Sequence, residues 1–193
     1  MIENSLTARH ILLDRDGVIN QRIPDGYVTC WEQFEFLPRA LDALRLLAER
    51  CYRVIVVSNQ SCVGKGLMNA EELAQLTRRF VDAAAKSGGR ICDVYYCPHR
   101  AEDRCECRKP NPGLLRSAQR EHGFVFTQTF LIGDSERDLI AAHQVGCPSI
   151  LVRGDASNDF DPRSAPHRPR ATVADLYEAV QFILGSGQDG KDA

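Results

Sequence analysis

The stretch that decides the fold is H-I-L-L-D-R-D-G-V-I-N, residues 10–20. An apolar run that stops at charged residues and a glycine is typical of the end of a buried parallel strand, where open α/β sheets bind their ligands. Asp14 and Asp16 stand at that end. One carboxylate could attack a phosphate and the other could shuttle a proton, provided that a cation offsets the repulsion of the substrate. Asp and Gly are also ordinary turn formers, so the motif alone leaves both interpretations open.

The rest of the chain alternates apolar runs with helical patterns, which is typical of a parallel sheet flanked by helices. Asn69 is predicted to cap a helix over 70–86, because acidic residues follow it in the first turn. We therefore predict an α/β fold with a doubly wound parallel sheet. Further strands are expected at 53–58, 91–96, 129–134 and 148–153, further helices at 38–50, about 112–122 and up to Val145, and a last strand and helix within 171–184.

The length of 193 residues and the hydrophobic content of 44% suit one domain with a substantial core. We expect a single domain over 1–185, a disordered tail at 186–193, and a surface loop over the polar segment 155–170. Neither 16–58 nor 58–109 is long enough to hold a full cap domain besides its strand and helix. Loops, including 20–37, must therefore cover the site.

The formal net charge of −2 gives no electrostatic reason to expect a nucleic-acid or membrane-surface protein. The N-terminal stretch lacks the apolar core of a signal peptide, and no run is long enough to span a bilayer. We expect a cytoplasmic protein, monomeric, with a small-molecule partner and without a nucleic-acid or membrane partner.

Four soft or borderline metal ligands lie in C-P-H-R-A-E-D-R-C-E-C, residues 97–107. This spacing suits tetrahedral zinc, and a closed shell of three cysteines and one histidine leaves no position for water, so such a metal is structural. The alternative is four free residues on a surface loop. The predicted ligands are Cys97, His99, Cys105 and Cys107, and the other cysteines are expected to be core or incidental thiols: Cys30, Cys51, Cys62, Cys92 and Cys147.

Two cations follow the last predicted zinc ligand directly. Lys109 suits a phosphate and its developing charge, and the planar Arg108 suits a second anionic group. Zinc bound to Cys107 would fix the direction of both side chains. Taken alone, a solvated basic pair explains them equally well.

Polar residues also follow two other predicted strands. Ser58 and Asn59 end the second strand, where a hydroxyl and backbone amides can cradle a phosphoryl group. Asp134 ends the fourth strand and is a natural second carboxylate for Mg²⁺, although an Asp there could equally cap the next helix. Asp138 is expected to support the site through hydrogen bonds rather than to bind the metal.

Together the four pieces D-R-D-G, S-N-Q, C-R-K and G-D-S-E-R-D resemble the haloacid dehalogenase (HAD) phosphatase superfamily, subclass III, over about residues 10–152. The zinc loop, P-D-G-Y-V, F-E-F-L-P and S-N-Q-S-C-V-G-K-G look like the D-glycero-D-manno-heptose 1,7-bisphosphate 7-phosphatases. Histidinol-phosphate phosphatases have a similar zinc loop and are the close alternative.

The resemblance implies a Rossmann-like HAD core, Asp14 as nucleophile, Asp16 as general acid and base, and Ser58 with Lys109 stabilising the phosphoryl group. It also implies Mg²⁺ held by Asp14, the backbone carbonyl of Asp16, and Asp134. The substrate contacts that it implies are Pro24, Asp25, Gly26, Tyr27, Ser58, Asn59, Gln60, Ser61 and Arg108.

Two residues depart from the family pattern. Val18 stands where a Thr is usual, and Ser135 stands where the heptose enzymes often have a Lys that meets the substrate. The second departure weakens the case for a bisphosphate, although Lys65, Arg108 or Arg137 could supply the charge.

The predicted function is therefore Mg²⁺-dependent hydrolysis of a small sugar phosphate, the heptose bisphosphate at its 7-phosphate, through an aspartyl-phosphate. The alternatives are a histidinol-phosphate phosphatase, a nucleic-acid end phosphatase, and a non-enzymatic phospho-acceptor domain. The nucleic-acid enzyme lacks support because no basic, aromatic stripe is evident. The phospho-acceptor domain would need neither the zinc loop nor a proton donor at Asp16.

Overall fold

The computed structural model describes residues 9–153 and 167–186. Six parallel strands form one sheet in the order β3-β2-β1-β4-β5-β6. The strands are β1 (Arg9–Leu13), β2 (Tyr52–Asn59), β3 (Ile91–Cys97), β4 (Phe130–Gly133), β5 (Ser149–Val152) and β6 (Ala171–Val173). The chain order reverses at β1, which lies between β2 and β4, so the predicted doubly wound α/β fold is confirmed.

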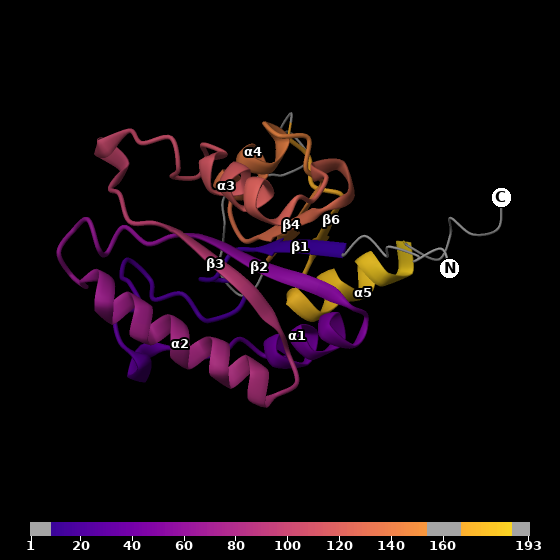
Figure 1. The fold of residues 1–193 in the computed structure, drawn as a ribbon, viewed down its shortest axis with the longest axis horizontal. Helices are drawn as coiled ribbons and strands as arrows, with labels where there is room; N and C mark the ends of the chain where they lie inside the picture. The colour runs from indigo at the N-terminus through magenta and orange to yellow at the C-terminus, as the bar shows by residue number, and fades with distance from the viewer. Residues whose placement is uncertain (1–8, 154–166, 187–193) are drawn as a thin grey trace.

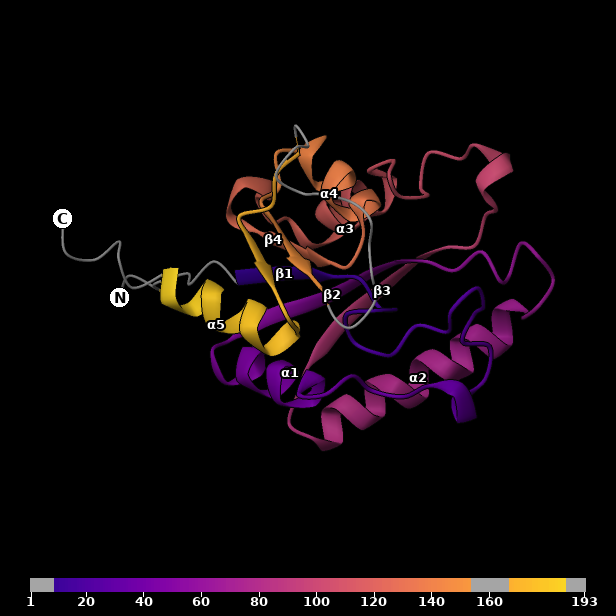
Figure 2. The same cartoon turned by 180° about the vertical axis from the view of Figure 1, so that it is seen from behind.

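The helices cover both faces of the sheet (Figures 1 and 2). They are α1 (Ala40–Glu49), α2 (Ala70–Lys86), α3 (Gly113–His122), α4 (Glu136–His143) and α5 (Leu176–Ser186). One core lies under α1, α2 and α5, and a second lies under α3 and α4. Ile11 and Leu13 of β1 enter the first core and Leu12 enters the second, because successive side chains of a strand point to opposite faces.

Local sequence signals explain where the longest helix begins. The Asn69 side chain accepts from the Glu72 backbone N–H at 2.9 Å, and the Glu72 side chain accepts from the Asn69 N–H at 2.7 Å. This reciprocal capping box confirms the predicted cap of α2. By contrast, α1 begins at Ala40 rather than at Pro38, after Arg39 in a left-handed conformation.

The loop between β1 and α1 contains a short 3₁₀ helix, Trp31–Gln33, that the sequence pattern did not predict. Phe34, which follows it, stacks on Phe80 of α2 with ring centroids 5.4 Å apart and so fastens this loop to the first core. The loop therefore has a fixed position above the sheet. No large cap domain interrupts the described residues, as predicted.

Of the predicted tail at 186–193, Ser186 instead ends α5 and the rest lies outside the described residues, as does most of the predicted loop at 155–170. Within residues 9–153 and 167–186, none of the helices has the length and apolarity needed to cross a membrane.

Candidate active site

The candidate site lies where β1, β2 and β4 end side by side. Asp14 follows β1, Ser58 is near the end of β2, and Asp134 follows β4. The backbone N–H of Asp14 donates to the carbonyl of Ile132 at 2.9 Å and so continues the pairing of the two strands. A cavity of about 380 Å³ opens at this edge. Thus the switch point of the strand order carries the carboxylates, as the predicted topology required.

Lys109 joins two carboxylates at the bottom of the cavity. Its Nζ lies 3.0 Å from Asp14 Oδ1 and 2.5 Å from Asp138 Oδ1, and it donates to the carbonyl of Val57 at 2.8 Å. Burial lowers the pKa of Lys109, but Asp138 and Asp14 outweigh burial and raise it overall. The side chain is therefore a fixed ammonium ion.

The environment of Asp14 disfavours the charged form of its carboxyl group. Burial raises its pKa, the Lys109 charge lowers it, and the neighbouring charges of Asp138 and Asp16 raise it again, with a net upward shift. A cation bound next to Asp14 would therefore stabilise its ionised form.

Asp16 is held by side chains that sequence reasoning did not all identify. Arg15 Nη2 lies 2.9 Å from Asp16 Oδ1, Gln60 Nε2 donates to Oδ2 at 2.7 Å, and Asn20 Nδ2 donates to Oδ1 at 2.9 Å. Burial raises the pKa of Asp16, but Arg15 and the hydrogen bonds lower it overall. Arg15 is fully buried, and its place between two aspartates in the sequence was the available signal.

Asp134 completes a group of three buried carboxylates with Asp14 and Asp138, whose ligand atoms lie within 4.8 Å of one another. Burial and the charge of Asp14 raise the pKa of Asp134 to about 7. Asp138 is engaged by Lys109, while Asp14 and Asp134 face the cavity. Oxygen ligands with unbalanced negative charge fit a hard divalent cation such as Mg²⁺.

Most of the predicted substrate contacts line the cavity. They are Asp25, Gly26, Tyr27, Ser58, Asn59, Ser61 and Arg108. Pro24 and Gln60 do not line it: Gln60 is buried and hydrogen-bonds Asp16 and Ser58. Asn59 faces the cavity and also braces Lys109, because its amide exchanges two hydrogen bonds of 3.0 Å with the Lys109 backbone.

The cavity wall also contains Lys65 and Arg137, which the sequence offered as possible sources of charge for the substrate, and Arg22, which it did not. Lys65 Nζ lies 5.2 Å from the centroid of the Tyr27 ring, and the Tyr27 hydroxyl accepts from Ser61 at 3.3 Å. Arg22 Nη1 lies 2.9 Å from Asp134 Oδ2. No motif identified Arg22, because it lies in an irregular loop, where spacing does not predict direction.

The two departures from the family pattern have structural roles. Val18 is fully buried in the first core. Ser135 caps α4, where its hydroxyl donates to Asp138 Oδ2 at 2.5 Å and its backbone N–H donates to the same oxygen at 3.2 Å. Ser135, rather than Asp134, is therefore the cap, and Asp138 gains the hydrogen bonds that the sequence predicted for it.

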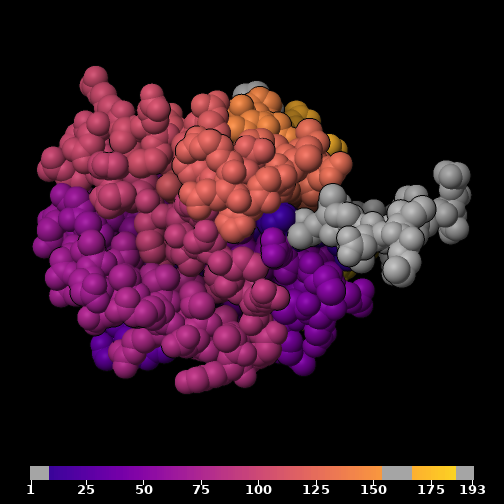
Figure 3. Space-filling model, in the orientation of Figure 1, coloured from indigo at the N-terminus to yellow at the C-terminus, as the bar shows by residue number. Residues whose placement is uncertain are grey.

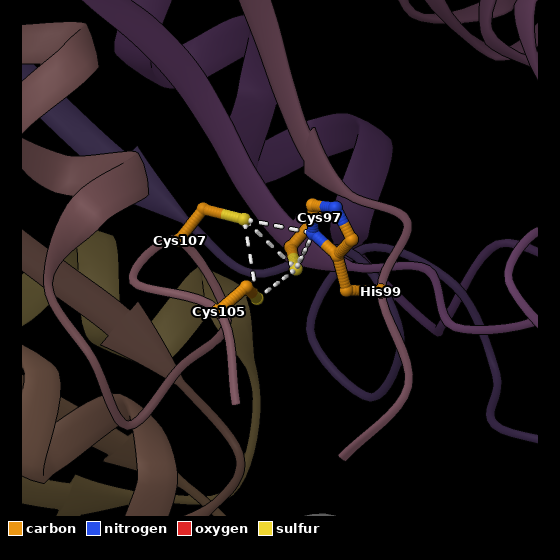
Figure 4. A group of neighbouring side chains, drawn as sticks. All are labelled: Cys97, His99, Cys105 and Cys107. Atoms are coloured by element: carbon orange, nitrogen blue, oxygen red, sulfur yellow. Dashed lines mark hydrogen bonds between the residues drawn. The ribbon is translucent and has the colours of Figure 1, made fainter. Parts of the chain in front are cut away.

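The second cluster is formed by Cys97, His99, Cys105 and Cys107 in the loop after β3 (Figure 4). The three sulfur atoms lie 3.2 to 3.5 Å apart, and His99 Nδ1 lies 3.2 Å from Cys107 Sγ and 3.6 Å from Cys97 Sγ. Around tetrahedral zinc, sulfur ligands stand about 3.8 Å apart. The four donor atoms thus converge closely enough to hold a metal.

This loop continues directly into the site. Arg108 Nη1 donates to the carbonyl of His99 at 3.3 Å, and Asn111 Nδ2 donates to the carbonyl of Cys105 at 2.8 Å. The backbone N–H of Gly64, after β2, donates to the carbonyl of Pro98 at 2.9 Å. The space-filling view shows purple and rose segments in contact on one side of the molecule (Figure 3). The four-ligand cluster therefore lies next to the cavity, which its loop reaches through Arg108 and Lys109.

Gly17 is the position where an added methyl group should damage the carboxylate cluster most directly. Its φ is +87°, and a Cβ there would lie 2.1 Å from Asp134 Oδ2. We expect Gly17→Ala to weaken Mg²⁺ binding at least about tenfold, because Asp134 must move. Gly66→Ala is the matched control, since Gly66 has a φ of +70° with nothing within 4 Å. Equal Mg²⁺ affinities of the two variants by calorimetry would contradict the expectation.

Comparisons with known proteins agree with this geometry. The HAD-hydrolase-like family model matches residues 106–179. D-glycero-beta-D-manno-heptose-1,7-bisphosphate 7-phosphatase of Photorhabdus laumondii is 34% identical, over 90% of this chain and 95% of its own. D-glycero-alpha-D-manno-heptose-1,7-bisphosphate 7-phosphatase of Mycobacterium bovis is 39% identical, over 76% of this chain and 80% of its own.

A solved structure matches almost throughout. The D,D-heptose 1,7-bisphosphate phosphatase from B. bronchiseptica, complexed with magnesium and phosphate, has a TM-score of 0.84 and 32% identity, over 92% of this chain and 99% of its own. The fold and the carboxylate site define a phosphoric monoester hydrolase of the HAD type. Within that class, the chain belongs to the D-glycero-D-manno-heptose-1,7-bisphosphate 7-phosphatase family.

Proposed function

We propose that this protein removes the 7-phosphate of D-glycero-D-manno-heptose 1,7-bisphosphate in a Mg²⁺-dependent reaction through an aspartyl-phosphate on Asp14. The observation that carries the proposal is the position of Asp14 at the end of β1, with Lys109 Nζ at 3.0 Å and Asp134 in the same carboxylate cluster. The named activities of the relatives support the choice of substrate.

Two aspartates divide the chemistry. Asp14 attacks phosphorus, and Asp16 gives a proton to the departing sugar oxygen; Asp16 then takes a proton from the water that hydrolyses the aspartyl-phosphate. Arg15 keeps the pKa of Asp16 low, which favours the basic form needed in the second step. In the first step, the negative charge of the bound phosphate favours the protonated form of Asp16, which can then act as the acid.

The remaining side chains of the site bind the phosphoryl group or the metal. Lys109 and the hydroxyl of Ser58 bind the phosphoryl oxygens, while Asp14, the carbonyl of Asp16, and Asp134 would hold Mg²⁺. The metal supplies charge neutralisation that lets a carboxylate approach a phosphate. Asn59 and Asp138 keep Lys109 in place through the contacts described above.

The charge of the cavity favours a bisphosphate. Among the described residues that line it, five are cationic (Arg22, Lys65, Arg108, Lys109 and Arg137) and four are acidic (Asp14, Asp16, Asp25 and Asp134). With a divalent cation added, the wall carries a clear positive excess, which suits two phosphate groups. Histidinol phosphate carries a cationic amine instead and would leave that excess unpaired.

The cysteine and histidine cluster would hold structural zinc. Four protein donors complete a tetrahedral shell, so the metal would have no open position for water. It would fix the loop that carries Arg108 and Lys109. We also infer a single-domain, monomeric protein. Its eight free cysteines suit a reducing compartment such as the cytoplasm.

The substrate proposal is tested by phosphate release with Mg²⁺ from the heptose 1,7-bisphosphate and from histidinol phosphate, measured as kcat/KM. We expect a preference for the bisphosphate of at least about 100-fold, equivalent to roughly 3 kcal/mol of differential transition-state binding. Faster hydrolysis of histidinol phosphate would overturn the substrate while leaving the mechanism in place. A single stable phosphorylation without turnover would instead indicate a phospho-acceptor domain.

Mg²⁺ binding should depend on pH through Asp134. Because the pKa of Asp134 is raised to about 7, its carboxyl group is protonated below that pH and cannot bind the cation. We expect Mg²⁺ affinity about tenfold weaker at pH 6 than at pH 8 by calorimetry. Without Mg²⁺, the same raised pKa makes the free energy of unfolding fall as pH rises from about 4 to 7, because the native state holds the proton more tightly. A Mg²⁺ affinity that is constant over pH 6–8 would contradict this assignment.

A further inference from the structure

Arg22 adds to the positive charge of the cavity, but the proposed function assigns it no contact of its own. Its Nη1 lies 2.9 Å from Asp134 Oδ2, and its side chain is 51% exposed whereas that of Asp134 is 10% exposed. A half-exposed arginine paired with a buried carboxylate can leave its partner by rotating its stem into the cavity.

The paired oxygen, Asp134 Oδ2, lies beside Gly17, the residue that follows Asp16. A Cβ on Gly17 would lie 2.1 Å from Asp134 Oδ2 and 3.0 Å from Arg22 Cδ, so both side chains pack against this glycine. Oδ2 therefore lies close to the backbone next to Asp16, whose carbonyl would supply the main-chain metal ligand. A guanidinium on Asp134 would compete with a divalent cation for this carboxylate.

Arg22 also has a suitable second partner. A guanidinium presents the same pair of donors to a phosphate as to a carboxylate. In the proposed function, Lys109 and Ser58 already bind the transferred phosphoryl group. Arg22 lines the same cavity as Arg108 and Lys65, so its guanidinium is available to the other phosphate of a bisphosphate.

We propose that Arg22 determines specificity by exchanging partners: it pairs with Asp134 until a divalent cation takes that carboxylate, and it then binds the non-transferred phosphate of the substrate. The second half rests on the proposed function, because it requires a bisphosphate. Metal binding would thereby prepare the site for the doubly charged substrate.

The test compares wild type with Arg22→Ala and Arg22→Gln in Mg²⁺-free buffer. By calorimetry with MgCl₂ we expect both variants to bind Mg²⁺ at least about fivefold more tightly, since the competing ion pair is gone. Arg137→Ala removes a charge from the same cavity and is the control for a general field effect, for which we expect a change of less than about twofold. Thermal melting of each variant checks that it is folded.

Steady-state kinetics at saturating Mg²⁺ test the second half. For Arg22→Ala we expect KM for the heptose bisphosphate to rise at least about tenfold, with KM for p-nitrophenyl phosphate changed less than about threefold. Unchanged or weaker Mg²⁺ binding by both Arg22 variants, or a gain that Arg137→Ala matches, overturns the competition; an unchanged KM overturns the phosphate contact. If wild type does not hydrolyse the bisphosphate, the proposed function and the phosphate contact fall together, while the Mg²⁺ titration still decides the competition.

Discussion

Asp14→Asn is expected to abolish phosphate release, with kcat at least about 10⁴-fold below wild type. An amide at this position has the shape of the carboxylate but cannot attack phosphorus, and it removes a negative ligand of Mg²⁺. The fold should remain, because Asp14 is a buried group whose charge is disfavoured by burial and is offset only in part by Lys109. A malachite-green assay and far-UV circular dichroism measure the two properties.

Asp82→Asn is the matched control, since Asp82 is exposed on α2 and lies outside the cavity. We expect this variant to retain wild-type activity and stability. Turnover by Asp14→Asn within about tenfold of wild type would contradict the assignment of the nucleophile. Loss of activity together with loss of the circular dichroism signal would instead show that the fold does not accommodate the amide, and Asp14→Ser then tests the same assignment.

Cys107→Ser is expected to release zinc and to lower both stability and activity. Cys107 is one of four converging donors, and a serine hydroxyl is a poor zinc ligand. We expect the free energy of unfolding to fall by at least about 3 kcal/mol, because binding of a structural zinc contributes directly to folding. Since Arg108 and Lys109 follow Cys107, kcat/KM should fall by about 10–100-fold.

Zinc content by mass spectrometry, denaturant unfolding and phosphate release give the three readouts. Cys30→Ser is the control, because Cys30 is an exposed thiol outside the cluster. If removal of a verified zinc left the melting temperature and turnover unchanged, the proposed structural role of the metal would be wrong.

The sequence was most informative where structure depends on local pattern. The apolar run ending at Asp14, the cap at Asn69 and the alternation of strands and helices predicted the sheet and its helices. Ser58 and Asp134 could be expected near Asp14, because carboxyl ends of neighbouring parallel strands meet at one edge. The clustering of four metal ligands in one loop likewise followed from their spacing.

Contacts between distant side chains could not be predicted in the same way. Gln60 appeared from its motif to be a substrate contact, but in the structure it hydrogen-bonds Asp16 and does not line the cavity. Arg22 belongs to no motif, and D-R-D-G gives Arg15 no role of its own, since the partners of both depend on how the loop after β1 folds over the site. Ser135 reads as a lost substrate contact, yet it caps α4 and orients Asp138.

A ³¹P NMR time course of D-glycero-D-manno-heptose 1,7-bisphosphate with the wild-type protein and Mg²⁺ tests most directly whether the protein removes the 7-phosphate. We expect the 7-phosphate resonance to disappear as inorganic phosphate appears in equal amount, while the 1-phosphate resonance persists. Loss of the 1-phosphate, or no inorganic phosphate over many equivalents of enzyme, would contradict this activity.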